Sequence, residues 1–158
     1  MNFGWSFNAA ASRVRDSFIA IAQIVVAAMA GYSIAHFGLS HSTPIFAVTV
    51  TIASLGFTRD ARIRRVFETA IGMVVGIALS EVSLLVIGSG VPQMALVLLI
   101  ALLTARFLSN NAAFALTVGL QAMLVYIAPT PEGGAFVRSL DGVIGGITAL
   151  VFTAFLPR

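Results

Sequence analysis

The stretch RIRRVFETAIGMVVG, residues 62–76, decides the fold class. Three arginines open it, and a mainly apolar segment follows to about residue 87. On a helix, Glu68 lies on the same face as Gly72 and Gly76, and Arg65 lies on that face one turn earlier. Small residues let membrane helices pack closely, so we expect this face to point at other protein rather than at lipid. A charged residue on such a face is a functional hypothesis.

The composition predicts an integral membrane protein. Of 158 residues, 59% are hydrophobic and only 9% are charged, and the mean hydropathy is +1.02. Soluble domains are nearer one quarter charged. The net charge of +3 comes from arginines at segment ends, a placement typical of membrane topology rather than nucleic-acid binding. The chain has no cysteine, which excludes disulfides, thiolate metal sites and a cysteine nucleophile.

Six apolar segments predict an all-α protein with six transmembrane helices. The first sixteen residues are expected to form an interfacial segment, with a frayed terminus as the alternative. The second apolar segment is short, at about 20 Å of helix. Short segments often mark transport sites, but tilt or a thinned bilayer explains shortness equally well. Thr58 is expected to cap the third helix. The expected segments are residues 17–39, 45–57, 66–87, 91–107, 111–128 and 137–156.

The arginines predict the orientation of these segments. With a cytoplasmic N-terminus, eight arginines fall inside, and only Arg138 falls outside. This bias is the one that the positive-inside rule requires, and it also places the C-terminus in the cytoplasm. We therefore expect a multi-pass protein of the bacterial inner membrane with the bilayer as a partner. The eight are Arg13, Arg15, Arg59, Arg62, Arg64, Arg65, Arg106 and Arg158.

The two halves of the chain show an internal repeat. Residues 65–76, RVFETAIGMVVG, align with residues 138–149, RSLDGVIGGITA. In this alignment Glu68 matches Asp141, and Gly72 matches Gly145. Upstream, FAVTV at residues 46–50 matches FALTV at residues 114–118. Three segments precede three similar ones, so the second set must enter the membrane inverted. We expect a single membrane domain, residues 1–158, with repeats at about residues 17–87 and 91–156.

These motifs resemble the fusaric acid resistance and aromatic acid exporter superfamily. The likeness rests on PIFAVTV, residues 44–50, and on RVFETAIGMVVG, residues 65–76. Arg65, Thr69, Gly72 and Gly76 match the family pattern, whereas Glu68 stands where the family usually has glycine. The resemblance implies a six-helix unit that pairs with another, here a homodimer. It also implies export or passive passage of organic, often aromatic, anions.

Glu81 is the candidate that stands out among the charged residues, because it lies well inside the third segment. A buried acid can be neutral and exchange protons, as proton-coupled export requires, or it can merely join helices. Glu68 and Asp141 each follow an arginine by three residues, so they are path candidates or partners of Arg65 and Arg138. Gln23 and Gln121 are expected to contact substrate or to bridge helices. The remaining candidates are an anion-attracting mouth of Arg59, Arg62 and Arg64 and the packing positions Gly72, Gly76, Gly142, Gly145 and Gly146.

Three function classes remain open. The first is a proton-coupled exporter of organic anions, the second a passive anion channel, and the third a membrane subunit that transports nothing alone. An enzyme is not expected, because no nucleophile–base pair or phosphate loop can be found in the sequence. No cofactor, metal or nucleic acid is expected. His36 and His41 are too few, and too near the surface, for a metal site.

Overall fold

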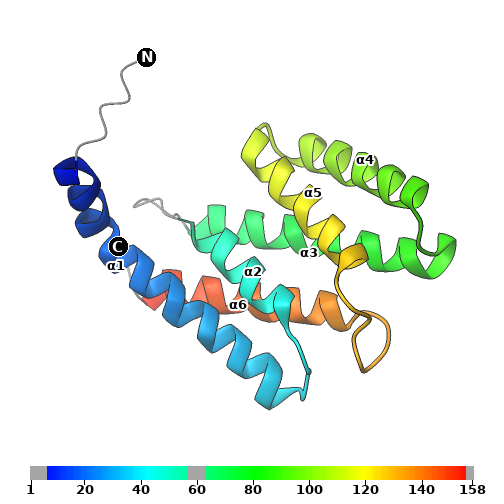
Figure 1. Ribbon diagram of the computed structural model, residues 1–158, viewed down its shortest axis with the longest axis horizontal. Coiled ribbons are helices and arrows are strands. Elements are labelled where there is room, and N and C mark those ends of the chain that lie inside the picture. Colours follow the sequence, from blue (N-terminus) through cyan, green and yellow to red (C-terminus); the bar gives the residue numbers. More distant parts are fainter. Residues whose placement is uncertain (1–6, 57–62, 156–158) are drawn as a thin grey trace.

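A computed structural model describes residues 7–56 and 63–155 of the chain, and the described part is all-helical (Figure 1). The first helix ends in a π-helical turn, η1, and the connection from residue 39 to residue 44 leads to the second helix. The helices are α1 (Phe7–Ser33), η1 (Ile34–Gly38), α2 (Ile45–Leu55), α3 (Ile63–Ile87), α4 (Val91–Leu108), α5 (Ala112–Ile127) and α6 (Val137–Phe155).

Six helices agree with the expected number of apolar segments, but only four are long and apolar enough to cross a membrane. These four, within the described part, are α1 with its π-helical turn, α3, α4 and α6. α2 has 11 residues and α5 has 16. At a rise of about 1.5 Å per residue they are roughly 16 and 24 Å long. α2 ends at Leu55, before the expected boundary, because Gly56 adopts φ +55°.

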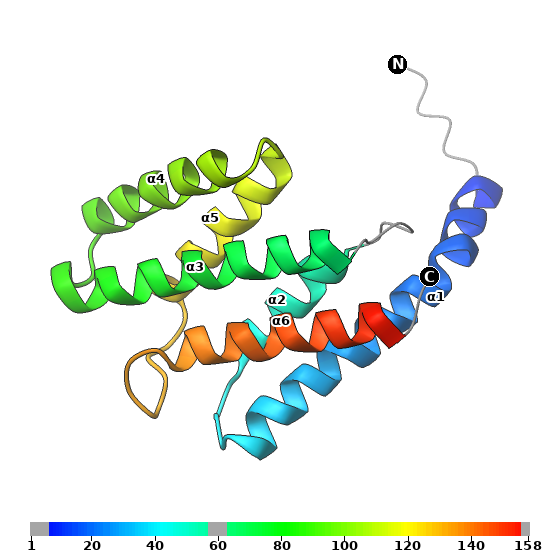
Figure 2. The same ribbon diagram turned by 180° about the vertical axis from the view of Figure 1, so that it is seen from behind.

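α3 and α6 lie side by side and antiparallel at the centre of the bundle (Figure 2). α2 packs against α6, and α5 packs against α3. α1 packs on α2 and α6, while α4 packs on α5 and α3.

The bundle has two ends. The near end is the one at which α1, α3 and α5 begin. The far end is where α2, α4 and α6 begin (Figure 1).

The glycines of α3 and α6 allow these close contacts. A Cβ atom at Gly145 would collide with the carbonyl oxygen of Ala47 in α2. A Cβ atom at Gly76 would lie 2.8 Å from Cγ1 of Val118 in α5. At Gly72 it would overlap the ring of Phe114. The glycine faces of both central helices are therefore occupied by neighbours within the same chain.

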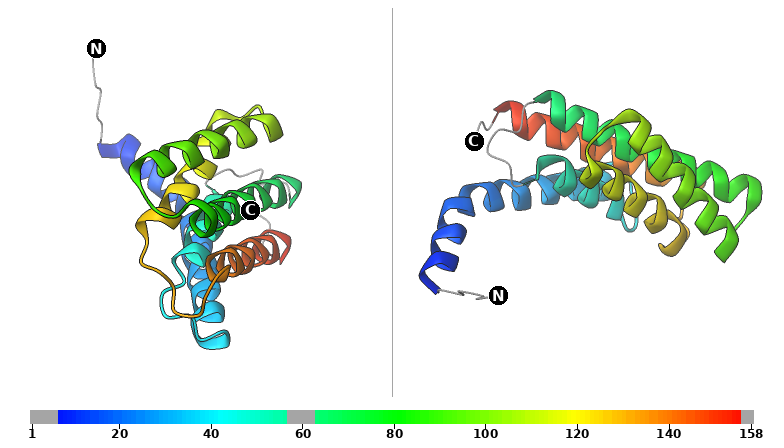
Figure 3. Two further views of the ribbon diagram at one scale, coloured as in Figure 1. Left: turned by 90° about the vertical axis from the view of Figure 1, so that its right-hand side faces the viewer. Right: turned by 90° about the horizontal axis from the view of Figure 1, so that it is seen from above.

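The first turns of α1 differ from the expected boundary. The sequence predicts a spanning segment that begins near residue 17, whereas α1 begins at Phe7. Its N-terminal turns, dark blue in Figure 3, run at an angle to the rest of the helix. Trp5, part of the expected interfacial segment, lies outside the described residues, as do the expected cap Thr58 and the C-terminal Arg158.

Large apolar side chains cover the outside of the bundle. Leu103 and Leu116, for example, are 62% and 68% exposed, and Val25 and Ile147 are more than half exposed. The interior contains Phe46, Met73 and Ile77 together with small residues. Soluble monomers rarely expose so much continuous apolar surface. This distribution fits helices that face lipid.

Candidate functional site

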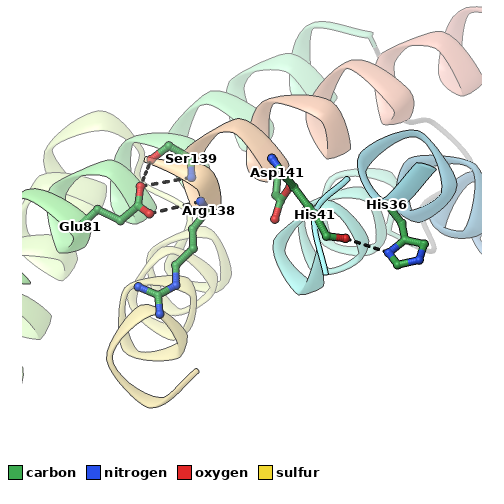
Figure 4. Close-up of polar contacts among 6 residues, drawn as sticks. All are labelled: His36, His41, Glu81, Arg138, Ser139 and Asp141. Atoms are coloured by element: carbon green, nitrogen blue, oxygen red, sulfur yellow. Dashed lines mark hydrogen bonds and ion pairs between the residues drawn. The ribbon is translucent and has the colours of Figure 1, made fainter. Parts of the chain in front are cut away.

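The far end holds a cluster of buried polar residues from α3, α6 and the connection before α2 (Figure 4). Glu81 of α3 reaches the beginning of α6. Its carboxylate accepts hydrogen bonds from the backbone N–H groups of Arg138 and Ser139, each at 3.2 Å, and from the hydroxyl group of Ser139 at 2.5 Å. The first N–H groups of a helix have no partner within the helix and favour a negative charge. Glu81 therefore acts as a cap supplied by another helix.

Arg138 is buried at the same end, with 6% of its surface exposed. Its guanidinium donates hydrogen bonds to the carbonyl oxygens of Ala128 and Pro129, at 3.0 and 2.9 Å. These carbonyls follow the last turn of α5, where a positive charge is favourable. Arg138 thus ties the beginning of α6 to the end of α5.

Asp141 pairs with a residue that the sequence analysis set aside. Nδ1 of His41 lies 2.5 Å from Oδ1 of Asp141, and Asp141 is 2% exposed. Nδ1 of His36 lies 2.8 Å from the carbonyl oxygen of His41. The expected pair between Arg138 and Asp141 is not among the ion pairs of the described residues. The two members of the actual pair are 100 positions apart, so helix periodicity gave no signal for it.

A small cavity lies beside this cluster. Its volume is about 20 Å³, enough for roughly one water molecule. It is lined by His41, Phe46, Arg138 and Asp141, among others. The connection before α2 thus lies closed against α6 at the far end.

The near end is arranged differently. Glu68 was expected to face protein and to pair with Arg65, but it is exposed and pairs with Arg64 at 2.7 Å. Such a pair is common on a helix, since the two side chains are one turn apart. Arg65 is exposed, and its guanidinium has no hydrogen-bond or ion-pair partner among the described residues. The expected mouth residues Arg59 and Arg62 lie outside the described residues.

Two cavities flank Arg65. The larger has a volume of about 560 Å³ and lies between α3 and the turn from α4 to α5. The smaller has a volume of about 140 Å³ and lies between the end of α2, α3 and α5. Four residues line both cavities, and they are Arg65, Thr69, Asn111 and Phe114.

The smaller cavity also contains an unsatisfied polar group. Ser54 is 7% exposed, and its hydroxyl oxygen has no hydrogen-bond partner in the described part of the chain. The residue lines the smaller cavity. A buried hydroxyl without a partner is destabilising, so a hydrogen bond gained by Ser54 would be favourable.

The remaining candidates lie in helix contacts. Gln23 of α1 donates a hydrogen bond to the carbonyl oxygen of Phe152 in α6 at 3.0 Å. Gln121 of α5 accepts one from the hydroxyl of Thr49 in α2 at 3.2 Å. All five glycines that were expected to be packing positions are in close contact with other helices: Gly72, Gly76, Gly142, Gly145 and Gly146.

Comparison with known proteins identifies the family of the chain. The family described as fusaric acid resistance protein-like matches residues 24–152. The chain belongs to that family. It is accordingly similar to membrane transporters rather than to enzymes, and its several long apolar helices fit a multi-pass membrane protein.

Two relatives show how much of a longer protein the chain represents. An uncharacterised protein of Corynebacterium glutamicum is 30% identical over 146 residues, covering 92% of this chain and 38% of that protein. A protein of Mycobacterium bovis named "Putative arylamide transporter" is 29% identical over 153 residues, which cover 94% of this chain and 43% of that protein. The Mycobacterium tuberculosis relatives of the same name match equally well. The chain therefore spans about two fifths of the length of these relatives. No solved structure matches it.

Proposed function

We propose that the chain is the membrane unit of an exporter of organic anions, in particular of aromatic carboxylates. The observation that carries the proposal is the difference between its two ends. At the near end, cavities of about 560 and 140 Å³ flank an arginine without a partner in the described part. At the far end, the cavity beside the matching arginine is about 20 Å³. A transporter open to one side at a time requires such a difference.

The neighbours of each helix support the inverted repeat on which this proposal depends. An inverted repeat makes α1, α2 and α3 equivalent to α4, α5 and α6. Under that exchange the contact of α2 with α6 becomes that of α5 with α3. The contacts of α1 with α2 and α6 become those of α4 with α5 and α3. We propose repeats at residues 17–87 and 91–156 within one membrane domain.

Equivalent residues behave differently at the two ends. In the repeat alignment Asp141 corresponds to Glu68, and His41 corresponds to Ser109. At the far end, His41 contacts Asp141 across the bundle. At the near end, Glu68 pairs within its own helix, and Ser109 instead accepts a hydrogen bond from the backbone N–H of Asn111. Opening the first contact and forming one like it at the other end would exchange the open and closed ends.

We propose proton coupling through the far-end cluster. It contains three ionisable groups besides Arg138, namely Glu81, Asp141 and His41. Glu81 already accepts three hydrogen bonds, an environment suited to an ionised carboxylate. The pair of His41 and Asp141 is the better place for a proton to bind, because the imidazole nitrogen and the carboxylate oxygen lie 2.5 Å apart and can share it.

The orientation and assembly complete the proposal. We propose that the near end, where the arginines concentrate, faces the cytoplasm of a bacterial cell, as the positive-inside rule predicts. We also propose a parallel homodimer, since the described helices, with the short α2 and α5 among them, make only a thin wall around a path for an aromatic acid. The dimer contact must use apolar faces, because the glycine faces are filled within the chain. Native mass spectrometry in mild detergent would refute the dimer by finding a monomer that still transports.

Flux in proteoliposomes tests the function. Benzoate uptake should depend on a pH gradient, and His41→Gln should lose that dependence. Uptake that is unaffected by the gradient in the unsubstituted chain would instead favour a passive channel. If the purified chain moves nothing, it is a subunit that needs a partner.

A second cargo class follows from the relatives. Two fifths of a protein named for arylamides matches this chain, so a neutral arylamide is the alternative cargo. Acetanilide should then cross in place of benzoate and compete with its flux. Benzoate flux that acetanilide leaves unchanged would favour the carboxylate.

A further inference from the structure

The crevice beside Arg65 has the size and chemistry of a small-molecule site. A volume of about 560 Å³ falls within the range of ligand pockets, roughly 300–1,000 Å³. Its apolar wall contains Phe67, Ile71, Leu108 and Phe114. The polar residues of the lining are Arg65, Glu68, Thr69, Ser109 and Asn111. Such a lining suits a molecule with an apolar body and a single polar head.

Three observations indicate that the head is an anion. The guanidinium of Arg65 has no partner among the described residues, whereas its equivalent, Arg138, is bound by two carbonyls. Asn111 uses its side-chain oxygen to cap α5, which leaves the amide group to donate. The one acid in the lining, Glu68, is already paired with Arg64. The local balance of charge is therefore positive.

The second cavity continues the space at the near end, between α2, α3 and α5. Arg65, Thr69, Asn111 and Phe114 line both spaces, so they form the boundary between them. Beyond that boundary lies the buried hydroxyl of Ser54, which has no partner in the described part. Because Ser54 lines this space, we infer that its hydroxyl turns toward an anion held by Arg65.

We propose that this boundary is the loading site for a small carboxylate with a flat apolar body. Arg65 and Asn111 bind the carboxylate, Ser54 donates to it from the inner side, and the body lies against Phe114. The inference rests on the proposed function and identifies where its substrate first binds. The site has a second part between three helices, α2, α3 and α5, so the proposed occupant is a free small molecule rather than the headgroup of a lipid.

Thiol protection tests the site without any flux. The chain has no cysteine, so Thr69→Cys supplies the only thiol, in the lining of both cavities. In phosphatidylcholine nanodiscs, benzoate should slow the reaction of this thiol with N-ethylmaleimide. Benzyl alcohol, which is neutral, should not. Equal protection by the two compounds would overturn the proposal.

Arg15 provides the control for the arginine. It is exposed, carries the same charge at the same end of the bundle, and is absent from the lining of both cavities. Arg64 is unsuitable, because its loss would release Glu68 into the larger cavity. Arg65→Gln should raise the half-protecting benzoate concentration about tenfold or more, since hydrogen bonds to charged groups are strong. Arg15→Gln should change it by less than about twofold. Similar losses in both variants would mean a diffuse surface effect and would refute the site.

Two further arms complete the experiment. Ser54→Ala should raise the half-protecting concentration by roughly two- to tenfold. An unchanged value would refute the placement of the head at the inner boundary. In nanodiscs with phosphatidylglycerol, benzoate should still protect, whereas protection by this anionic lipid alone would replace the proposed ligand with a lipid. Protection by benzoate without benzoate flux would refute the proposed function but support the site. Benzoate flux without protection would support the function but refute the site.

Discussion

Gly145 offers a quantitative test of how the bundle is built. It lies where α6 crosses α2, and its carbonyl oxygen accepts a hydrogen bond of 3.0 Å from the hydroxyl of Thr51. A Cβ atom added there would collide with the carbonyl oxygen of Ala47 and lie 3.1 Å from the carbonyl carbon. These are backbone atoms, which cannot rotate away. In Gly145→Ala, α2 and α6 must therefore move apart.

The magnitude follows from two opposed terms. Overpacking a well-packed interior costs about 1–3 kcal/mol. Alanine gains up to about 1 kcal/mol over glycine inside a helix. Since the obstacle is backbone, we expect a net loss of about 1–2 kcal/mol. For a chain of this size the loss corresponds to a fall in Tm of about 2–8 °C.

Thermal unfolding in detergent, followed by circular dichroism, measures this change. Gly38→Ala is the control, because a Cβ atom there meets nothing within 4 Å. We expect the control to melt within about 1 °C of the unsubstituted protein, as surface changes usually do. If the Tm of Gly145→Ala equals that of the Gly38→Ala control, α2 and α6 do not cross as closely as described.

Two other predictions concern the far end. Glu81→Gln removes the negative charge from the beginning of α6, so Tm should fall by the equivalent of about 0.5–2 kcal/mol; an unchanged Tm would refute the capping role. His41→Ala leaves the carboxyl group of Asp141 buried and unpaired, so the free energy of unfolding should fall by up to about 3–5 kcal/mol. Adding Asp141→Asn to this variant should recover part of that loss. If the losses of the two single variants simply add in the double variant, measured in the same thermal assay, the two residues do not interact.

Much of the fold can be predicted from the sequence, because apolar segments and glycine spacing are local signals. The apolar stretches predicted the six helices to within a few residues at most boundaries. The glycines at 72, 76 and 145 marked faces that do contact other helices. The expected end of α2 was too late in the sequence, because Gly56 ends the helix before the apolar stretch itself ends.

The site could be predicted only in part, because its contacts join distant positions. Glu81 was recognised as a buried acid, but its role depends on α6 beginning beside it, which the sequence does not show. His41 was considered only as a metal ligand and set aside as too near the surface, and only the fold brings it to Asp141. Arg64 and Arg65 are adjacent in the sequence. The position of the α4–α5 turn decides which of them faces the crevice.

The central claim, that one end is open while the other is closed, can be measured directly by thiol accessibility from each side. Thr69→Cys reports on the near end. Val137→Cys reports on the far end, because the Val137 side chain lines the far-end cavity and the residue is only 7% exposed. In resting proteoliposomes we predict fast labelling at residue 69 and slow labelling at residue 137. During benzoate flux the second thiol should become reactive as the first is protected. Equal labelling of both thiols at rest, or rates that flux leaves unchanged, would contradict the account.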